Sequence, residues 1–167
     1  MVLASEFTIN FVKDPQGYAK AQQHGIDLSV KSIGLHRPIN ASILVDRTDI
    51  DFDPQLSILE PRYTFLSPKD SRCGWKLAPG YYNIIFDQGV TVPTNCKANI
   101  IHRSSIARAG GWLFSAEYDP GFETEFAGAF LLVHSPMFIE EHARIAQIVF
   151  YEIRGEVTPY NGQWQGK

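Results

Sequence analysis

The 167-residue chain has no excess of basic residues and no long apolar run. Lys and Arg number 15 against 18 Asp and Glu, which gives a net charge of −3. General nucleic-acid binders usually carry a basic surface instead. No run approaches the roughly 18 apolar residues of a membrane span, and the first ten residues lack the features of a secretory signal. We therefore expect a cytoplasmic protein that binds neither nucleic acid nor membranes, while a few local Arg and Lys residues suffice for a small anionic ligand.

Cysteine is scarce, and neither cysteine nor histidine is spaced like a set of metal ligands. Cys73 and Cys96 form no CxxC pair. Two free thiols are expected in a reducing compartment, and a single disulfide between them is the open alternative. The five histidines form no HxH or HExxH pattern, and the zinc-deaminase signature of His-x-Glu with a later Pro-Cys-x-x-Cys is absent. We expect these histidines on the surface or in hydrogen-bonded core positions.

Helical periodicity is also scarce. Short β-branched and aromatic runs alternate instead with ten prolines and thirteen glycines, as in antiparallel β-sandwiches and barrels of one domain. The runs are Gly25–Val30, Ala41–Val45, Gly80–Phe86, Ala98–His102, Ala127–His134 and Ala143–Ile153. Two short helical turns are expected, at Asp14–Gln23 and at Ser104–Gly110, where serines suit an N-cap and glycines suit a C-cap.

The second helical turn is a candidate anion site. Ser104 and Ser105 stand at its start, and Arg103 and Arg108 flank them. Free backbone N–H groups at a helix start, together with hydroxyl and guanidinium groups, suit a phosphate. A capped surface helix with solvated arginines explains the same residues, and this segment alone favours that simpler interpretation.

Three other polar residues stand within or beside apolar runs. Asp27, in "HGIDLSV", either caps a turn or has a functional role. Gln147, in "RIAQIVF", lies among apolar neighbours and needs a hydrogen-bond partner from the protein or from a ligand. Asp119, in "YDPGF", begins the Asp-Pro-Gly signal of a turn. A plain hairpin explains Asp119, and a carboxylate that orients water at a strand end is the alternative.

The order of these segments resembles the dUTPase and dCTP deaminase superfamily. The pieces are "HGIDLSV", "HRSSIARAG", "YDPGF", "RIAQIVF" and "YNGQWQGK", and the resemblance runs from about Gln22 to the end of the chain. Its details are closer to the dCTP deaminase-like branch, which includes archaeal and viral dUTPases, than to bacterial or eukaryotic dUTPases. The resemblance implies an all-β fold, a distorted barrel or jelly-roll-like subunit with one or two short helices, in a homotrimer whose active sites are shared between subunits.

The resemblance also implies the ligand and the residues that hold it. It implies a barrel over residues 1–159 and a mobile lid over residues 160–167, which otherwise resemble a frayed polar tail. The ligand is a deoxynucleoside triphosphate with Mg²⁺ carried on its phosphates. The phosphate-binding residues are then Arg103, Ser104, Ser105, Arg108, Gln147, Gln163, Gln165 and Lys167.

By the same resemblance, Asp119 is catalytic and orients the attacking water, and Asp27 supports the water shell of the metal. The base packs near the hairpin from Phe114 to Phe122 and pairs with its backbone, while Phe122 lies against the deoxyribose and excludes a 2′-hydroxyl. Trp164 closes over the nucleotide. The base- and sugar-binding residues are Phe114, Ala116, Tyr118, Phe122 and Trp164.

One position separates dUTP hydrolysis from dCTP deamination. Deaminases of this superfamily resemble one another in a proton-handling glutamate about ten residues after the aspartate of the turn. Here that position is Ala129, the next residues Phe130–Leu132 are apolar, and Glu123 and Glu125 come too early. The sequence therefore predicts a dUTP diphosphatase that releases dUMP and pyrophosphate. A dCTP deaminase or bifunctional enzyme, and a non-catalytic nucleotide-binding relative, are the alternatives.

Overall fold

The computed structural model describes residues 1–36, 63–65, 73–162 and 165–166. Within these ranges strands dominate, and the helical elements are short. The helical elements are α1 (Ser5–Thr8), η1 (Ile9–Phe11) and α3 (Ser104–Arg108). The strands are β1 (Val12–Lys13), β2 (Lys20–Ala21), β3 (Ile26–His36), β4 (Tyr63–Phe65), β5 (Gly74–Leu77), β6 (Gly80–Phe86), β7 (Gly89–Thr91), β8 (Cys96–His102), β9 (Gly111–Phe114), β10 (Glu123–Thr124), β11 (Gly128–Val133), β12 (Met137–Glu140) and β13 (Arg144–Glu152).

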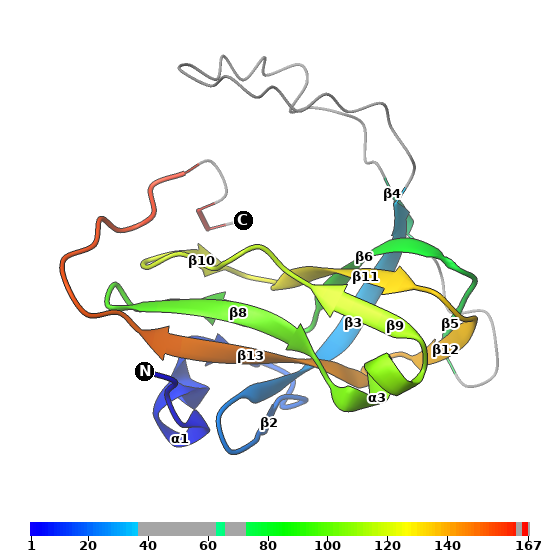
Figure 1. The fold of residues 1–167 in the computed structure, drawn as a ribbon, viewed down its shortest axis with the longest axis horizontal. Helices are drawn as coiled ribbons and strands as arrows, with labels where there is room; N and C mark the ends of the chain where they lie inside the picture. The colour runs from blue at the N-terminus through cyan, green and yellow to red at the C-terminus, as the bar shows by residue number, and fades with distance from the viewer. Residues whose placement is uncertain (37–62, 66–72, 163–164, 167) are drawn as a thin grey trace, which may run out of the picture.

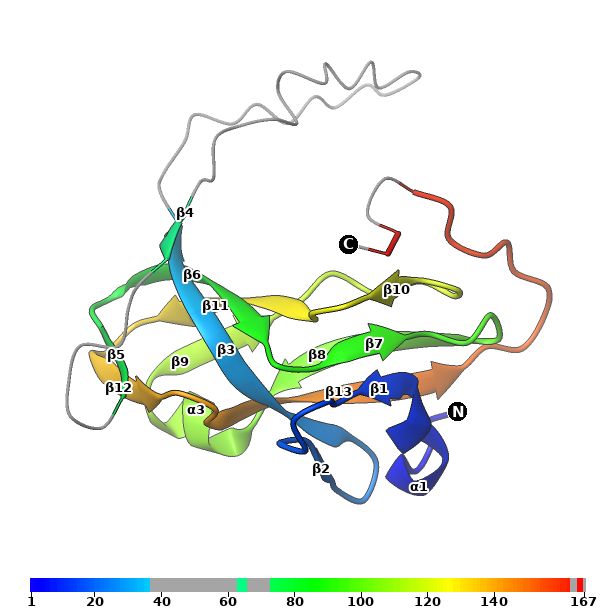
Figure 2. The same ribbon diagram turned by 180° about the vertical axis from the view of Figure 1, so that it is seen from behind.

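The main sheet closes into a barrel. Its strand order is β13-β8-β9-β11-β6-β3-β2, and β13 also pairs with β3. Six antiparallel strands therefore form a ring, which Figure 1 and Figure 2 show from opposite sides. Two small sheets, β1-β7-β10 and β5-β12, lie outside this ring. The prediction of an all-β barrel with short helices is confirmed.

Alternation along the strands explains the core. In β6, Tyr82, Ile84 and Phe86 are buried, whereas the residues between them are half-buried on the outer face. The same alternation runs through β11. Successive side chains of a strand point to opposite faces, so one apolar row per strand fills the barrel. Each fully buried Leu, Ile or Phe stabilises the fold by about 1.5–3 kcal/mol.

The predicted strands agree with the structure wherever it describes them. Four of the six runs lie within two residues of β6, β8, β11 and β13. The run Gly25–Val30 is the first part of β3, which continues to His36. The run Ala41–Val45 lies outside the described residues.

The two predicted helical turns fare differently. The one at Ser104 is α3, although Arg103 is its N-cap residue and no side chain caps it. The one at Asp14–Gln23 is wrong, since the segment forms a turn and β2. The Asp14 carboxylate accepts the backbone N–H groups of Tyr18 at 3.2 Å and Ala19 at 2.8 Å. A side chain that satisfies these donors offers the backbone an alternative to a helix.

A buried polar cluster joins the N-terminal loop to the barrel. The Ser29 hydroxyl donates to Asp87 Oδ2 at 2.6 Å, and His142 Nδ1 lies 2.9 Å from the same oxygen. Gln88 Nε2 donates to Asp14 Oδ1 at 3.0 Å. Because Asp87 and Gln88 directly precede β7, the cluster fixes the start of that strand.

Both cysteines are free thiols, as predicted. Cys73 is exposed and Cys96 is buried, and burial raises the pKa of the Cys96 thiol. Among the described residues, every helix is too short or too polar to cross a membrane.

Gly89 lets β7 approach the end of β10 and the residue that follows it. A Cβ atom at this position would lie 2.5 Å from the carbonyl oxygens of both Thr124 and Glu125. Because both obstacles are backbone atoms, they cannot swing aside as a flexible side chain would. The contact therefore requires glycine and ties β7 to the segment that leads into β11.

We expect Gly89→Ala to lower the free energy of unfolding by about 1–3 kcal/mol, since overpacking forces the backbone to shift. Urea unfolding and thermal melts measure the change. Gly80→Ala is the matched control, because its nearest atoms are 3.4 Å away on the Tyr82 side chain, and it should stay within about 0.5 kcal/mol of the wild type. Equal stability of the two variants would contradict the close contact at Gly89.

Candidate functional site

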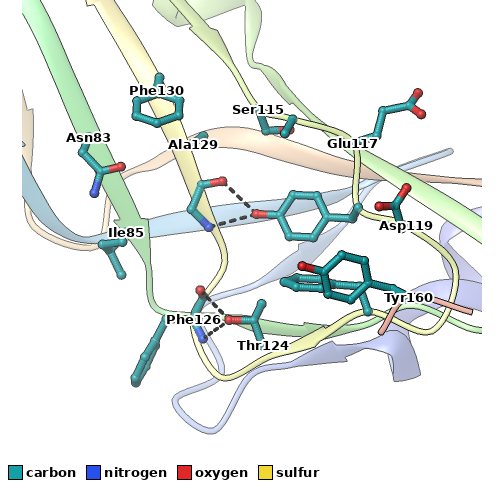
Figure 3. A pocket seen from close by; sticks show the side chains of 14 residues that line it. Asn83, Ile85, Ser115, Glu117, Asp119, Thr124, Phe126, Ala129, Phe130 and Tyr160 are labelled. Carbon is teal, nitrogen blue, oxygen red and sulfur yellow. Dashed lines mark hydrogen bonds between the residues drawn. The ribbon is translucent and has the colours of Figure 1, made fainter. Parts of the chain in front are cut away.

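A cavity of about 770 Å³ opens between β6, β11 and the hairpin segment, residues 115–126, that joins β9 to β11 (Figure 3). Its lining is mainly apolar and contains two acids, Glu117 and Asp119. The lining residues are Asn83, Ile85, Ser115, Ala116, Glu117, Tyr118, Asp119, Phe122, Thr124, Phe126, Gly128, Ala129, Phe130 and Tyr160.

Backbone pairing holds the turn that carries Asp119. Tyr118 exchanges two hydrogen bonds with Ala98 of β8, at 2.8 and 2.9 Å. The Phe122 N–H then donates to the carbonyl of Asp119 at 3.0 Å and closes the turn. Gly121 has a φ of +78°, which a side chain would strain. The Asp-Pro-Gly signal therefore forms the predicted turn and fixes Asp119 at the cavity.

Tyr118 ties this turn to β11. Its hydroxyl donates to the carbonyl of Gly128 at 2.7 Å and accepts the N–H of the same residue at 3.0 Å. Burial raises the pKa of Tyr118 to about 12, although its hydrogen bond to the Gly128 carbonyl acts in the opposite direction. The phenol is therefore neutral at physiological pH and serves the structure. Phe122 packs edge-on between the rings of Tyr118 and Tyr160.

Most other polar side chains of the lining are already bonded. The Ser115 hydroxyl accepts a backbone N–H from β8, and the Thr124 hydroxyl donates to a backbone carbonyl two residues further on. Glu117 forms an ion pair with Lys97, whose hydrogen bond lowers the pKa of the Glu117 carboxyl. The Asp119 carboxylate makes no hydrogen bond within the described part of the chain.

A second group of polar residues surrounds Asp27, which is fully buried. Gln147 Nε2 donates to Asp27 Oδ1 at 2.9 Å, and Gln22 Nε2 donates to Oδ2 at 2.8 Å. Arg103 Nε lies 3.6 Å from Oδ2. We call Asp27, Gln147, Gln22 and Arg103 the seam cluster, because β3 and β13 close the barrel here. The partner that the sequence required for Gln147 is thus Asp27.

The predicted phosphate-binding residues of α3 and of the seam cluster do not meet Asp119 within one chain. Ser104, Ser105 and Arg108 are exposed on α3, and neither they nor the seam cluster line the cavity. The hairpin segment pairs with β8 at Ala98, whereas α3 follows the other end of β8 (Figure 1). The four residue steps from Ala98 to His102 span about 13 Å at strand rise. Asp119 and the serines therefore lie at opposite ends of this strand.

Of the remaining predicted residues, some lie at the cavity and others do not. Ala116, Tyr118 and Phe122 line the cavity, whereas Phe114 does not. Gln165 lies against the hairpin segment, since its Nε2 donates to the carbonyl of Gly121 at 2.9 Å and its Oε1 accepts the N–H of Glu123 at 3.3 Å. Three predicted residues lie outside the described residues, namely Gln163, Trp164 and Lys167.

Several lining residues were not predicted from the sequence. Asn83 and Ile85 come from β6, Phe130 comes from β11, and Tyr160 comes from the C-terminal segment. Their approach depends on contacts between segments that are far apart in the sequence, which no local pattern reveals. Asn83 alone left a signal, because it is an amide at an outer position of the apolar run Gly80–Phe86.

The described residues contain no group of three or more His, Cys, Asp or Glu side chains placed to hold a metal ion. Both oxygens of Asp27 already accept amide N–H groups. A metal bound directly by Asp27 therefore does not fit this donor set. That Asp27 supports a metal indirectly, through the water molecules bound to it, stays a prediction.

Comparison with known proteins finds relatives that match most or all of the chain. No protein-family model matches. A protein of Methanocaldococcus jannaschii named deoxyuridine 5′-triphosphate nucleotidohydrolase is 33% identical over 169 residues, which is all of both chains. A probable enzyme of the same name from Methanosarcina mazei is 30% identical over 150 residues, covering 87% of this chain and 81% of its own.

Two solved structures share the fold. A 2′-deoxycytidine 5′-triphosphate deaminase from Agrobacterium tumefaciens superposes with a TM-score of 0.58 at 16% identity, over 89% of this chain and 47% of the deaminase chain. The EIAV dUTPase superposes with a TM-score of 0.51 at 13% identity, over 91% of this chain and 98% of its own. The fold is therefore that of the dUTPase and dCTP deaminase superfamily. With a relative 33% identical along its whole length, the chain belongs to the deoxyuridine 5′-triphosphate nucleotidohydrolase (dUTPase) family.

Proposed function

We propose that this chain is a dUTP diphosphatase, which hydrolyses dUTP to dUMP and pyrophosphate. The observation that carries the proposal is Asp119, a carboxylate without a protein partner among the described residues, at a mainly apolar cavity. It stands in a chain that resembles a named nucleotidohydrolase from end to end. A carboxylate held at a turn orients a water for attack on the α-phosphate.

The hairpin segment suits a pyrimidine. In the part of the chain that the structure describes, the backbone N–H and C=O groups of Ala116 and Glu117 take part in no backbone hydrogen bond. The edge of uracil offers two carbonyl acceptors and one N–H donor, which such backbone groups complement. Phe122 adds an apolar wall for the deoxyribose, and this wall gives a 2′-hydroxyl no hydrogen-bond partner.

The exposed hydroxyls of Ser104 and Ser105 and the guanidinium of Arg108 supply donors and charge for the phosphates, beside Arg103 and Gln147 of the seam cluster. Donors placed where negative charge develops lower the barrier of phosphoryl transfer. Mg²⁺ enters with the triphosphate, as part of the substrate. Once bound, it would neutralise charge on the phosphate oxygens.

The separation of Asp119 from the serines supports a site shared between subunits. If the α-phosphate lies at Asp119, the β- and γ-phosphates do not extend far enough to reach α3 of the same subunit, which lies at the other end of β8. A neighbouring subunit would supply those residues. Exposed apolar side chains on β8, β9 and β11 offer a contact surface, since large exposed apolar patches usually mark interfaces. They are Ile101, Trp112, Phe114 and Leu132, each 39–59% exposed. We therefore propose the homotrimer that the resemblance implies.

Deamination has less support. Of the lining acids, Glu117 is kept ionised by Lys97, which makes it a poor proton donor. β11 contributes Gly128, Ala129 and Phe130 to the lining and no acid. Glu123 and Glu125, the other acids near the turn, are paired with Lys13 and lie outside the lining. A proton-transfer catalyst must both reach the base and exchange protons with it. Glu117 fails the second requirement, and Glu123 and Glu125 fail the first.

We further propose that residues 160–167 act as a lid on the barrel of residues 1–159. Tyr160 lines the cavity, and its N–H donates to the carbonyl of Pro120 at 2.7 Å. Gln165 contacts the hairpin segment at Gly121 and Glu123. A segment that closes over the substrate excludes water from the site.

Asp119→Asn should lower kcat for dUTP at least about 100-fold, because the neutral amide lacks the charge and basicity with which a carboxylate activates the attacking water. The dissociation constant for a non-hydrolysable dUTP analogue should stay within about tenfold, since the amide keeps the size of the side chain. Pyrophosphate release and calorimetry measure the two effects. Glu156→Gln, at an exposed site outside the cavity lining, controls for the loss of a carboxylate. Near-normal turnover of Asp119→Asn would refute the assignment.

Mixed trimers test the shared site. Chains with Asp119→Asn and chains with Ser105→Ala should each be weakly active, and co-expression under two affinity tags should restore activity, because some sites then combine an intact Asp119 with an intact Ser105. Co-expression of Asp119→Asn with a chain that carries both Asp119→Asn and Ser105→Ala should restore no activity, because no chain then has an intact Asp119. Light scattering gives the assembly mass. A stable monomer that hydrolyses dUTP, or trimers without recovery, would contradict the shared site.

Truncation after Pro159 tests the lid. The removed residues are mainly polar, and none of them belongs to the described core, so the melting temperature should change by only a few degrees. Contacts made mainly in the closed complex are lost, so kcat should fall at least as much as KM rises. An unchanged kcat/KM would identify a frayed tail, and a lost trimer would identify a structural role.

A further inference from the structure

The polar side chains of the cavity divide into two groups. Those of Ser115, Glu117, Tyr118 and Thr124 are bonded to the protein, as described above. The other three make no hydrogen bond within the described ranges. They are Asn83, Asp119 and Tyr160. Because a ligand is recognised through a few convergent polar groups in a mainly apolar pocket, these three are the side chains left for the nucleotide.

Asn83 is the neutral member and lies in apolar surroundings. It stands on β6 between Gly34 of β3 and Phe130 of β11. The next residues on the same face of β6 are Tyr81 and Ile85. The amide is half-buried. Because every fully buried side-chain N or O atom in the described residues has a hydrogen-bond partner, the unbonded amide atoms of Asn83 are accessible from the cavity, and a ligand there can reach them.

The amide lies across the cavity from the catalytic carboxylate. In Figure 3, Asn83, Ile85 and Phe130 stand on one side, whereas Asp119 and Tyr160 stand on the other. On the proposed function, Asp119 acts at the α-phosphate. The base is the end of the nucleotide remote from that phosphate, so it extends toward β6 and Asn83.

We propose that Asn83 binds the exocyclic group at position 4 of the pyrimidine, by donating an amide N–H to O4 of uracil. This inference rests on the proposed function and adds a side chain to the base contacts of the hairpin segment. The backbone groups of Ala116 and Glu117 hydrogen-bond to one part of the polar edge of the base, and the Asn83 amide hydrogen-bonds to the O4 carbonyl at the other part of that edge. The flat face of the base packs among Ile85, Phe126 and Phe130.

The chemistry at position 4 makes the proposal specific. Uracil carries a carbonyl there, which only accepts hydrogen bonds, whereas cytosine carries an amino group, which donates. An aspartate at position 83 has nearly the shape of asparagine but only accepts when ionised. It would repel O4 of uracil and accept from the amino group of cytosine. A leucine of similar size would bond to neither group.

The test compares dUMP and dCMP binding by calorimetry for the wild type, Asn83→Asp and Asn83→Leu. We expect Asn83→Asp to weaken dUMP at least about tenfold and to shift the ratio of the two dissociation constants at least about tenfold toward dCMP. Asn83→Leu should weaken dUMP without a shift toward dCMP. In both variants kcat/KM for dUTP should fall. Thermal melts confirm that each variant is folded.

Asn95→Asp is the matched control, because it makes the same change at an exposed asparagine outside the cavity. It should leave both dissociation constants unchanged. If the wild type hydrolyses dUTP while Asn83→Asp keeps the wild-type ratio of dissociation constants, the role of Asn83 is refuted and the proposed function stands. If the wild type neither hydrolyses dUTP nor binds dUMP, the proposed function itself fails, and the inference fails with it.

Discussion

The closure of the barrel depends on a carboxylate without contact to solvent. Asp27 and Gln147 are register partners across the seam of β3 and β13, and their side chains bond to each other at 2.9 Å. Removing water from a charged group costs several kcal/mol unless other groups replace it. Gln22 and Arg103 complete that replacement. Since Arg103 is also the N-cap residue of α3, the interaction that closes the barrel fixes the start of the Arg-Ser-Ser segment.

This seam determines how the site is divided. β8 pairs with β13 along its length and meets the hairpin segment at Ala98, so it carries Asp119 near one end and α3 at the other. A straight strand cannot bring its two ends together. On the proposed function, the half of the site that cradles phosphates therefore has to work with the Asp119 half of another subunit. Assembly is then required by the geometry of one strand and not only by the apolar surface.

The sequence predicted what depends on local periodicity and missed what depends on distant pairing. β6 and β11 were readable because burial alternates along them. The turn after Asp14 could not be predicted, because the Asp14 carboxylate satisfies backbone N–H donors that the predicted helix would have used. The pattern around Gln147 required a partner but could not name Asp27, which lies 120 residues away. Phe114 was assigned to the base, yet it stands on β9 beside Phe130 and outside the cavity lining.

The candidate site follows from which polar groups the fold leaves without a partner. Tyr118 is used to lock the turn to β11, and Glu117 is held ionised by Lys97. What remains is one carboxylate, one amide and one phenol. Hydrolysis of the phosphoanhydride bond of dUTP needs a single positioned carboxylate, whereas deamination needs a group that passes protons to the base. The amide of Asn83 cannot do so, because it does not titrate. On the proposed function, the side of the cavity with Asn83 only has to bind the base, because the reaction takes place at the phosphates.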